Sequence, residues 1–411
     1  MKIQFLSLLS GIIFFSCQPN QNEFQITQIE TPNQLGGEGN LFASSNNQLY
    51  LSWVKYLNDS TDALVFSKLE NEKWNEPLEI ARGSNWFVNW ADFPSFVAYQ
   101  NNENHLAAHW LQKSASGTYD YDVRIAQSKN GGKSWDESFV IHRDSIAAEH
   151  GFATLIPLSN NRIFATWLDG RNTKSGHSEE DKEESGHSHG GGAMTLRTAE
   201  FDIDGNLFEE AELDNKICDC CQTDAVETSE GMIVVYRDRS EHEIRDISIV
   251  RKVNGEWTKP HSVHADNWEI TGCPVNGPAV DAIENSVAVT WFTSANGEAS
   301  VKVSFSNDSG AIFHSPIKID NGNPLGRVDI ELISKGKALV TWLENGEEDA
   351  EIRAIEVHSD GTKKESVLLT KTSPSRASGF PILERIGEDN YLGWTDVNGE
   401  KTRVRTMRFN W

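Results

Sequence analysis

The sequence predicts an all-β fold, a seven-bladed β-propeller with four-stranded antiparallel blades. Seven short apolar segments each end in an aromatic residue followed by polar residues, at intervals of 57, 57, 69, 55, 51 and 52 positions. A second apolar stretch precedes each segment across a turn rich in Gly, Asn or Asp, and alternating runs follow the first six. Such period-two runs are typical of antiparallel strands, and four-stranded repeats of about this length are typical of propeller blades. The aromatic residues are Trp53, Trp110, Trp167, Tyr236, Trp291, Trp342 and Trp394.

The chain begins with the features of an export signal. Lys2 precedes the apolar run IQFLSLLSGIIFF, which is too short to span a membrane as a mature helix. The FFSC ending resembles a bacterial lipobox, and this resemblance implies cleavage before Cys17 and acylation of that cysteine. An ordinary signal peptide with an incidental Cys17 is the alternative. We therefore expect residues 1–16 to be a lipoprotein signal peptide.

The remaining chain divides into a short linker and a ring. Residues 17–35 are expected to form a lipid-anchored linker, in which residues 24–31, FQITQIET, could supply a ring-closing strand. Residues 36–411 contain the seven units, and the last unit ends at Trp411 after only three strands. A strand from the N-terminus would complete this blade and leave no open sheet edge. A six-bladed ring plus an incomplete unit is the alternative.

Two turn motifs carry a resemblance to a known family. SKNGGKSW, residues 128–135, and SNDSGAIF, residues 306–313, follow the pattern Ser-x-Asp/Asn-x-Gly-x-x-aromatic. They resemble the Asp-boxes, or BNR repeats, of sialidase-like propellers, which implies the propeller fold over residues 36–411. With the segments NWADFPS, WLDGR, CDCCQ and GCPVNGP, the chain looks like a group of bacterial sialidase-like lipoproteins. For that group the label describes architecture rather than chemistry.

The propeller topology predicts which polar residues share a face. Loops that enter the inner strands and loops that leave the second strands open on the same face, where propellers usually bind ligands. The longest interval reflects an insertion after Trp167, NTKSGHSEEDKEESGHSHGGGAM, whose composition favours a solvated loop, with metal capture by its histidines as the alternative. The candidate ligand-binding residues on this face are Trp90, His150, Arg171, Arg239, Arg245, Asn276 and Arg327.

Arg239 and Arg245 have two interpretations. Guanidinium groups bind carboxylates in bidentate fashion, so both arginines could hold an acidic sugar. The alternative is that they pair with Asp238 and Asp246 and lock a hairpin.

Acidic residues on this face could supply the two carboxyl groups of a glycoside hydrolase. These catalytic candidates are Asp92, Glu149, Asp169 and Asp238. The family resemblance implies a different set for a sialidase: a tyrosine nucleophile assisted by a glutamate, an aspartate acid/base and three arginines. Tyr236 is the candidate nucleophile, although its alignment with the blade tryptophans favours packing. The sialidase Arg-Ile-Pro motif has no counterpart here, so exo-alpha-sialidase-like hydrolysis and binding without hydrolysis are both retained.

Four cysteines lie in loops that enter neighbouring inner strands, and they are Cys218, Cys220, Cys221 and Cys273. In an oxidising compartment this number favours structural disulfides, formed between Cys218 and Cys273, between the vicinal pair, or between one of that pair and Cys273. A thiolate site for Cu(I) or Zn(II) and a redox-active pair are the alternatives. We therefore expect no cofactor, with copper or zinc as the alternative.

The charge of the chain limits its partners. A formal net charge of −24 disfavours nucleic acid and anionic lipid surfaces. The leading expectation is an acidic glycan or other anionic small ligand, with membrane contact through the lipid anchor only. Alternatives are a copper- or zinc-handling protein and a non-enzymatic scaffold with an envelope protein partner. The expected location is the bacterial cell envelope, facing the periplasm or the exterior.

Overall fold

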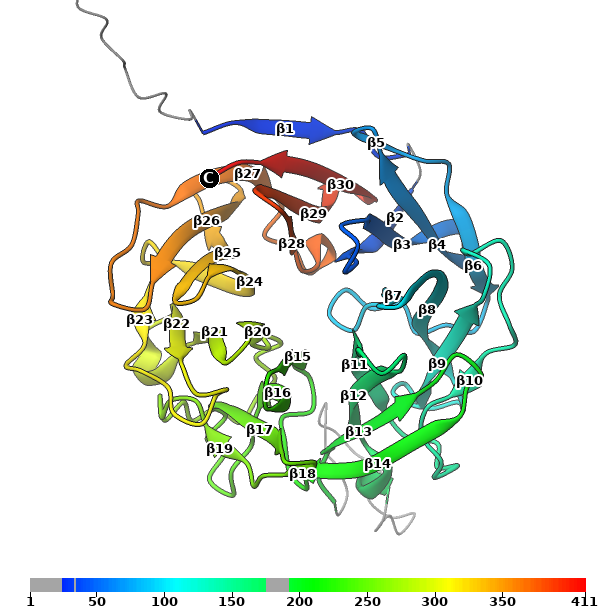
Figure 1. The fold of residues 1–411 in the computed structure, drawn as a ribbon, viewed down its shortest axis with the longest axis horizontal. Coiled ribbons are helices and arrows are strands. Elements are labelled where there is room, and N and C mark those ends of the chain that lie inside the picture. The colour runs from blue at the N-terminus through cyan, green and yellow to red at the C-terminus, as the bar shows by residue number, and fades with distance from the viewer. Residues whose placement is uncertain (1–23, 33–34, 175–191) are drawn as a thin grey trace, which may run out of the picture.

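The computed structural model describes residues 24–32, 35–174 and 192–411, which form a ring of seven antiparallel sheets around a central channel (Figure 1). This arrangement confirms the seven-bladed propeller and rules out the six-bladed alternative. From the channel outward, the first blade contains β2 (Gly36–Ala43), β3 (Leu49–Asn58) and β4 (Thr61–Glu70), and both β5 (Lys73–Trp74) and β6 (Leu78–Gly83) pair with β4. The second blade contains β7 (Ser95–Tyr99), β8 (Asn102–Lys113), β9 (Tyr121–Ser128) and β10 (Phe139–Val140). The third blade contains β11 (His150–Pro157), β12 (Ile163–Asp169), β13 (Thr195–Phe201) and β14 (Leu207–Asp214).

The remaining four blades complete the circle. They are β15 (Asp224–Thr228), β16 (Gly231–Arg237) and β17 (Ile247–Val253) with β18 (Glu256–Trp257) and β19 (His261–Ser262); β20 (Ala279–Ile283), β21 (Ser286–Thr293), β22 (Ser300–Ser306) and β23 (Ile317–Lys318); β24 (Pro324–Ser334), β25 (Lys337–Asn345), β26 (Ala350–His358) and β27 (Val367–Thr372); and β28 (Ile382–Ile386), β29 (Asp389–Asn398), β30 (Lys401–Phe409) and β1 (Ile26–Ile29). Three short 3-10 helices, η1 (Arg171–Lys174), η2 (Ala295–Gly297) and η3 (Arg376–Ser378), lie in loops. Within the described chain, no helix is long and apolar enough to cross a membrane.

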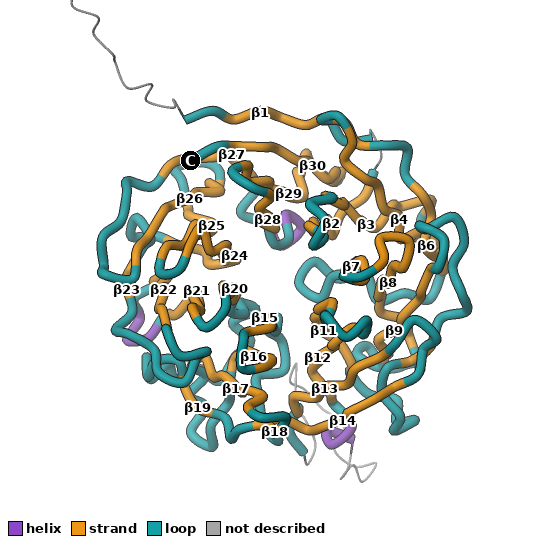
Figure 2. Tube along the Cα trace, viewed as in Figure 1, coloured by secondary structure: helices purple, strands orange, loops and turns teal. Residues whose placement is uncertain are grey.

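The two ends of the chain meet in the last blade. β1 pairs antiparallel with β30, from Ile26 opposite Phe409 to Ile29 opposite Thr406. Figure 2 shows β1 as the outermost strand of that blade, beside the C-terminus. The side chain of Thr406 also donates a hydrogen bond to the carbonyl oxygen of Ile29 at 3.0 Å. The N-terminal strand therefore supplies the outer strand that the last unit lacks.

The repeated aromatic residues occupy the second strand of each blade and fill the spaces between sheets. Trp167, Trp342 and Tyr236 have no exposed surface, and the other four are at most 5% exposed. Two of the buried indole N–H groups have carboxylate acceptors: Trp167 donates to Asp169 at 2.9 Å and Trp342 donates to Glu344 at 2.6 Å. Buried aromatic side chains contribute large apolar areas to a core, so the repeat visible in the sequence corresponds to the packing unit of the fold.

The two turn motifs adopt the same local hydrogen bonding. The N–H of Gly132 donates to Ser128 Oγ at 2.9 Å, and the N–H of Gly310 donates to Ser306 Oγ at 3.0 Å. Both follow the third strand of a blade, β9 or β22. Gly132, with φ +83°, and Gly310, with φ +77°, occupy the left-handed region that favours glycine. The equivalent hydrogen bonds and position show that these motifs shape hairpins between strands.

Carboxyl groups on the inner strands link the fourth, fifth, sixth and seventh blades in succession. Main-chain N–H groups of Val280, Leu332 and Leu383 donate to Asp224, Asp281 and Asp329 at 2.8, 2.6 and 2.7 Å. Each acceptor belongs to one inner strand and each donor to the inner strand of the following blade. Burial raises the pKa of Asp224 to about 8, of Asp281 to about 6 and of Asp329 to about 7. The channel wall is therefore built from partly buried carboxyl groups that each bond to a neighbouring strand.

Candidate functional site

The central channel contains a cavity of about 340 Å³. Inner strands of all seven blades line it, together with Asp92, Phe93, Gln222 and Phe380 from the loops that enter those strands. We call the face formed by these loops, and by the loops that leave the second strands, the upper face. Most of the residues singled out in the sequence lie on it or just beneath it.

A tyrosine and two acidic residues form a compact cluster beside the cavity. Tyr121 Oη lies 2.9 Å from Glu149 Oε1 and 3.1 Å from Asp92 Oδ2. Burial raises the pKa of Glu149 to about 8 and that of Asp92 to about 7. One hydroxyl proton cannot serve two ionised carboxylates, so at least one of the two carboxyl groups is protonated and donates to the tyrosine oxygen. Glu149 is half-buried while Asp92 and Tyr121 are buried, so Glu149 is the member that reaches the upper face.

Two arginines and an aromatic pair form a second group among the loops at the channel mouth. The guanidinium carbons of Arg327 and Arg376 are 5.0 and 5.8 Å from the ring centroid of Trp90, which stacks on Phe380 at 5.9 Å. Arg327 donates to Ser378 Oγ and to the carbonyl of Gly379.

Neither guanidinium is neutralised within the described chain, because no carboxylate there forms an ion pair with Arg327 or Arg376. Burial, followed by repulsion from Arg376, lowers the pKa of Arg327 to about 10, and the side chain remains charged at neutral pH. Arg327 is buried, whereas Arg376 is exposed. The pair therefore presents uncompensated positive charge next to an aromatic surface.

His150 and Arg171, expected to bind a ligand, lie instead in an internal charge network. His150 is fully buried and stacks on His142 with ring centroids 3.6 Å apart. Its Nε2 lies 3.2 Å from Asp144 Oδ2. Arg171 contacts Asp144 at 3.0 Å and Asp169 at 2.7 Å. Asp169 is itself fully buried, so this network stabilises the loops of the third blade rather than offering free charge.

Arg239 and Arg245 pair with Glu243 rather than with Asp238 or Asp246. Both guanidinium groups bind Glu243, at 2.7 Å from Arg239 and 2.8 Å from Arg245. Asp238 instead accepts the N–H of Arg239 and the hydroxyl of Ser248. The expectation of ion pairing was therefore right in kind, but the acidic partner is Glu243, four residues from Arg239.

Tyr236 and Asn276 support the framework. Tyr236 has no exposed surface and donates its hydroxyl proton to Asp214 at 2.5 Å. Asn276 accepts the N–H of Arg327 through Oδ1 at 2.7 Å and hydrogen bonds from the Arg237 guanidinium through its carbonyl. Tyr236 thus lies in the core of the fourth blade, and Asn276 connects neighbouring blades.

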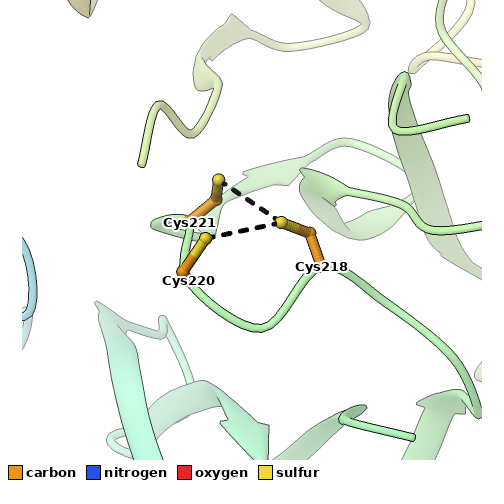
Figure 3. Close-up of side chains that lie close together, drawn as sticks. All are labelled: Cys218, Cys220 and Cys221. Carbon is orange, nitrogen blue, oxygen red and sulfur yellow. Dashed lines mark hydrogen bonds between the residues drawn. The ribbon is translucent and has the colours of Figure 1, made fainter. Parts of the chain in front are cut away.

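The cysteines converge without forming the disulfides that the sequence favoured. Sγ of Cys218 is 3.7 Å from Sγ of Cys220 and 3.7 Å from Sγ of Cys221 (Figure 3). All four described cysteines are free of disulfide bonds. A disulfide requires about 2.05 Å between the sulfurs. Cys273 lies beside this trio, with its Sγ 3.5 Å from Asp219 Oδ1 and within 4.8 Å of Cys220 Sγ. The loop before β15 therefore gathers three thiols at one point.

Electrostatics distinguish the three thiols. Burial raises the pKa of Cys218, but hydrogen bonds from Cys220 and Cys221 and the charge of Arg245 outweigh it and hold this pKa well below its ordinary value. Burial raises the pKa of Cys220 and Cys221. Cys218 is accordingly the thiol of the three that loses its proton most readily.

Some expected features lie outside the described residues. These are Cys17 with the signal peptide and most of the histidine-bearing insertion after Trp167. Met194, at the end of that insertion, is described and is buried in the core.

Sequence reasoning missed Tyr121 and the aromatic pairing of Arg376, and it overlooked His142 and Asp144. Tyr121 is the first residue of β9, directly after the loop that leaves β8. The same topological rule that selected Asp169 and Asp238 would have selected it. His142 and Asp144 precede β11 in the loop that also contains Glu149, and a search of that whole loop would have included them.

Comparison with known proteins identifies relatives in structure only. No protein-family model and no curated protein matches the chain. The polysaccharide lyase Uly1 superposes with a TM-score of 0.54 at 8% identity, covering 96% of this chain and 94% of its own. An ulvan lyase solved with a bound GlcA-containing repeat superposes with a TM-score of 0.54 at 11% identity, covering 90% of this chain and 94% of its own. A protein of unknown function from Dyadobacter fermentans superposes with a TM-score of 0.52 at 12% identity, covering 94% of this chain and 97% of its own. At these identities the likeness establishes a shared propeller fold.

Proposed function

We propose that this protein binds an acidic glycan on its upper face, at the mouth of the central channel. The observation that carries the proposal is the arginine pair beside Trp90, whose two guanidinium groups have no carboxylate partner among the described residues. Charge-assisted hydrogen bonds from arginine to a carboxylate or sulfate are among the stronger polar contacts in proteins. An anionic sugar would supply the missing counter-charge.

The positions of the two arginines suggest a division of roles. Arg327 is held by Ser378 and Gly379 and fixes the loop that carries η3. Arg376 is exposed and has freedom to meet a ligand. Trp90 and Phe380 provide an apolar surface beside the charge, as ligand sites with few, well-placed polar groups commonly do. Structural neighbours that are polysaccharide lyases, one of them bound to a GlcA-containing repeat, support a carbohydrate ligand on this fold.

The proposal extends to cleavage of the bound glycan. With a pKa of about 8, Glu149 is protonated at neutral pH and can serve as a general acid. Tyr121 bonds its carboxyl group, Asp92 bonds the same tyrosine hydroxyl, and a proton can pass among the three through the hydrogen bonds on Tyr121 Oη. The trio contains the tyrosine, glutamate and aspartate that the sialidase resemblance implies, with Tyr121 in place of Tyr236. We therefore propose a glycan-active enzyme, with hydrolysis of an acidic sugar as the reaction.

Binding measurements with an exposed arginine variant test this proposal. Arg376→Gln removes the free guanidinium, while Arg82→Gln, on the outer strand β6 and paired with Glu79, is the matched control. Loss of a hydrogen bond to a charged group costs about 1.5–3 kcal/mol, so we expect roughly 10- to 150-fold weaker binding of an oligoglucuronate or sialyllactose by calorimetry. Arg82→Gln should bind like the unchanged protein.

A folded protein that is inert toward a panel of uronate, sialate and sulfated oligosaccharides would overturn the proposal. If pull-downs then recovered an envelope protein, the scaffold alternative would replace it.

We also propose that the site works outside the cytoplasm, on a chain anchored through a lipidated Cys17. The proposal rests on the apolar run after Lys2 and the FFSC ending. Replacing Cys17 with Ser should release the protein from the membrane fraction and abolish palmitate labelling. Equal labelling of the variant would refute lipidation at this residue.

A further inference from the structure

We propose that Cys218, Cys220 and Cys221 bind one thiophilic metal ion, Zn(II) or Cu(I), beside the channel mouth. This metal site goes beyond the proposed glycan function and does not depend on it. Three sulfurs from one short loop converge at a single point, as Figure 3 shows.

The distances between the sulfurs fit coordination by one ion. Thiolates at about 2.3 Å from a tetrahedral Zn(II) lie about 3.8 Å from one another. The separations of Cys218 Sγ from the other two sulfurs are both 3.7 Å, and all three sulfurs lie within 4.8 Å of one another. The arrangement therefore provides three corners of a tetrahedron, or the three ligands of a trigonal Cu(I) site, without moving the backbone.

The loop that presents the sulfurs is held on both sides. The N–H of Cys218 donates to the carbonyl of Arg237 at 3.1 Å. Gln222, directly after the trio, donates to the carbonyl of Ala91 and accepts the N–H of Gly277. These contacts tie the loop to the second and fifth blades, so the ligands are positioned before any ion arrives.

Arg245 contacts one sulfur of the trio. Arg245 Nη1 is 3.3 Å from Cys218 Sγ, and its side chain is only 4% exposed. The same guanidinium pairs with Glu243 at 2.8 Å and lies 3.6 Å from Asp219. Arg245 therefore holds the sulfur of Cys218 in place by a hydrogen bond, while its charge is shared with two carboxylates.

Cys273 occupies a neighbouring position and defines the boundary of the site. It groups with Asp219 and Cys220, with all three ligand atoms within 4.8 Å, but it is not part of the three-sulfur group. The three-cysteine assignment therefore makes Cys273 a matched control, because it is a nearby half-buried thiol on the loop before the next blade.

Metal titration of the mature chain, purified without an affinity tag, tests the proposal. After removal of metal under reducing conditions, addition of Zn(II) or Cu(I) should give one bound ion per chain by native mass spectrometry, while Mg(II) should not bind. Co(II) should give thiolate-to-metal charge-transfer bands, which report sulfur ligation directly. Binding of neither soft ion by a folded protein with reactive thiols would overturn the proposal.

Serine variants locate the ligands. Cys218→Ser, Cys220→Ser and Cys221→Ser should each weaken binding at least 100-fold, with circular dichroism confirming the fold, and Cys273→Ser should retain the ion. If a variant fails to fold, protection of the three thiols from alkylation by bound Zn(II) in the unchanged protein provides the same test. Loss of the ion in Cys273→Ser would overturn the three-cysteine assignment, and disulfides among the trio in protein isolated from the envelope would overturn the metal site.

Discussion

Replacing Glu149 with Gln should make the protein more stable than the unchanged protein at alkaline pH, and it should remove the general acid proposed for glycan cleavage. The folded-state pKa of Glu149 is about 8, against an ordinary value of 4.5. Below pH 4.5 the carboxyl group is protonated in both folded and unfolded chains and does not affect stability. As pH rises toward 8, the unfolded chain ionises first, so the unchanged protein loses stability that Glu149→Gln keeps. The glutamine side chain can still accept the Tyr121 hydroxyl proton.

The size of this effect follows from the two pKa values. The interval between 4.5 and about 8 corresponds to at most about 5 kcal/mol, at 1.36 kcal/mol for each pH unit. Urea unfolding of both proteins at pH values from 5 to 9 measures it, because buried carboxyl groups that do not interact with Glu149 are common to both and cancel in the difference. The advantage of Glu149→Gln should grow with pH and level off above pH 8. A difference in unfolding free energy that stays constant with pH would refute the reasoning, and undiminished glycan cleavage by the variant would refute the proposed role of Glu149.

Three further predictions concern the ring. Trp342→Ala empties a fully buried site and should lower the free energy of unfolding by about 3–5 kcal/mol in chemical denaturation; a loss below 1 kcal/mol would contradict its packing role. Asp329→Ala leaves the N–H of Leu383 without its acceptor and should cost about 1–3 kcal/mol, whereas the exposed Asp59→Ala should be neutral. Deleting residues 24–31 exposes the edge of β30 and should lower the melting temperature and promote self-association in light scattering; an unchanged monomer would show that β1 is dispensable.

The fold could be predicted because the aromatic residue that packs between neighbouring blades recurs in the sequence at nearly regular intervals. Each aromatic residue, such as Trp167 or Trp342, is buried at the same position of a second strand. The position of the upper-face loops followed from that register alone, which brought Trp90, Glu149 and the cysteines to the correct neighbourhood.

The pairing of charges on that face could not be predicted in the same way. Arg239 and Arg245 share Glu243, although Asp238 and Asp246 are adjacent in the sequence. Which carboxylate an arginine meets depends on how the loop turns, and the repeat does not specify this. The burial of His150 against His142 likewise depends on an irregular loop between blades. The disulfides favoured by the sequence are absent at bonding distance among the described cysteines, because a count of cysteines carries no information about the distances between sulfurs.

The hydrogen bonds between inner strands connect neighbouring blades around the channel, so a change in one blade is passed to the next. Asp224, Asp281 and Asp329 each hold the following blade, and all of them face one channel. Alkaline conditions ionise all three groups, so their mutual repulsion weakens the packing of the fourth, fifth and sixth blades around the channel. We expect the ring to open first at the pairing of β1 with β30, because this is the one place in the described ring where the two ends of the chain meet. Unfolding at alkaline pH is therefore expected to begin with the separation of β1 from β30.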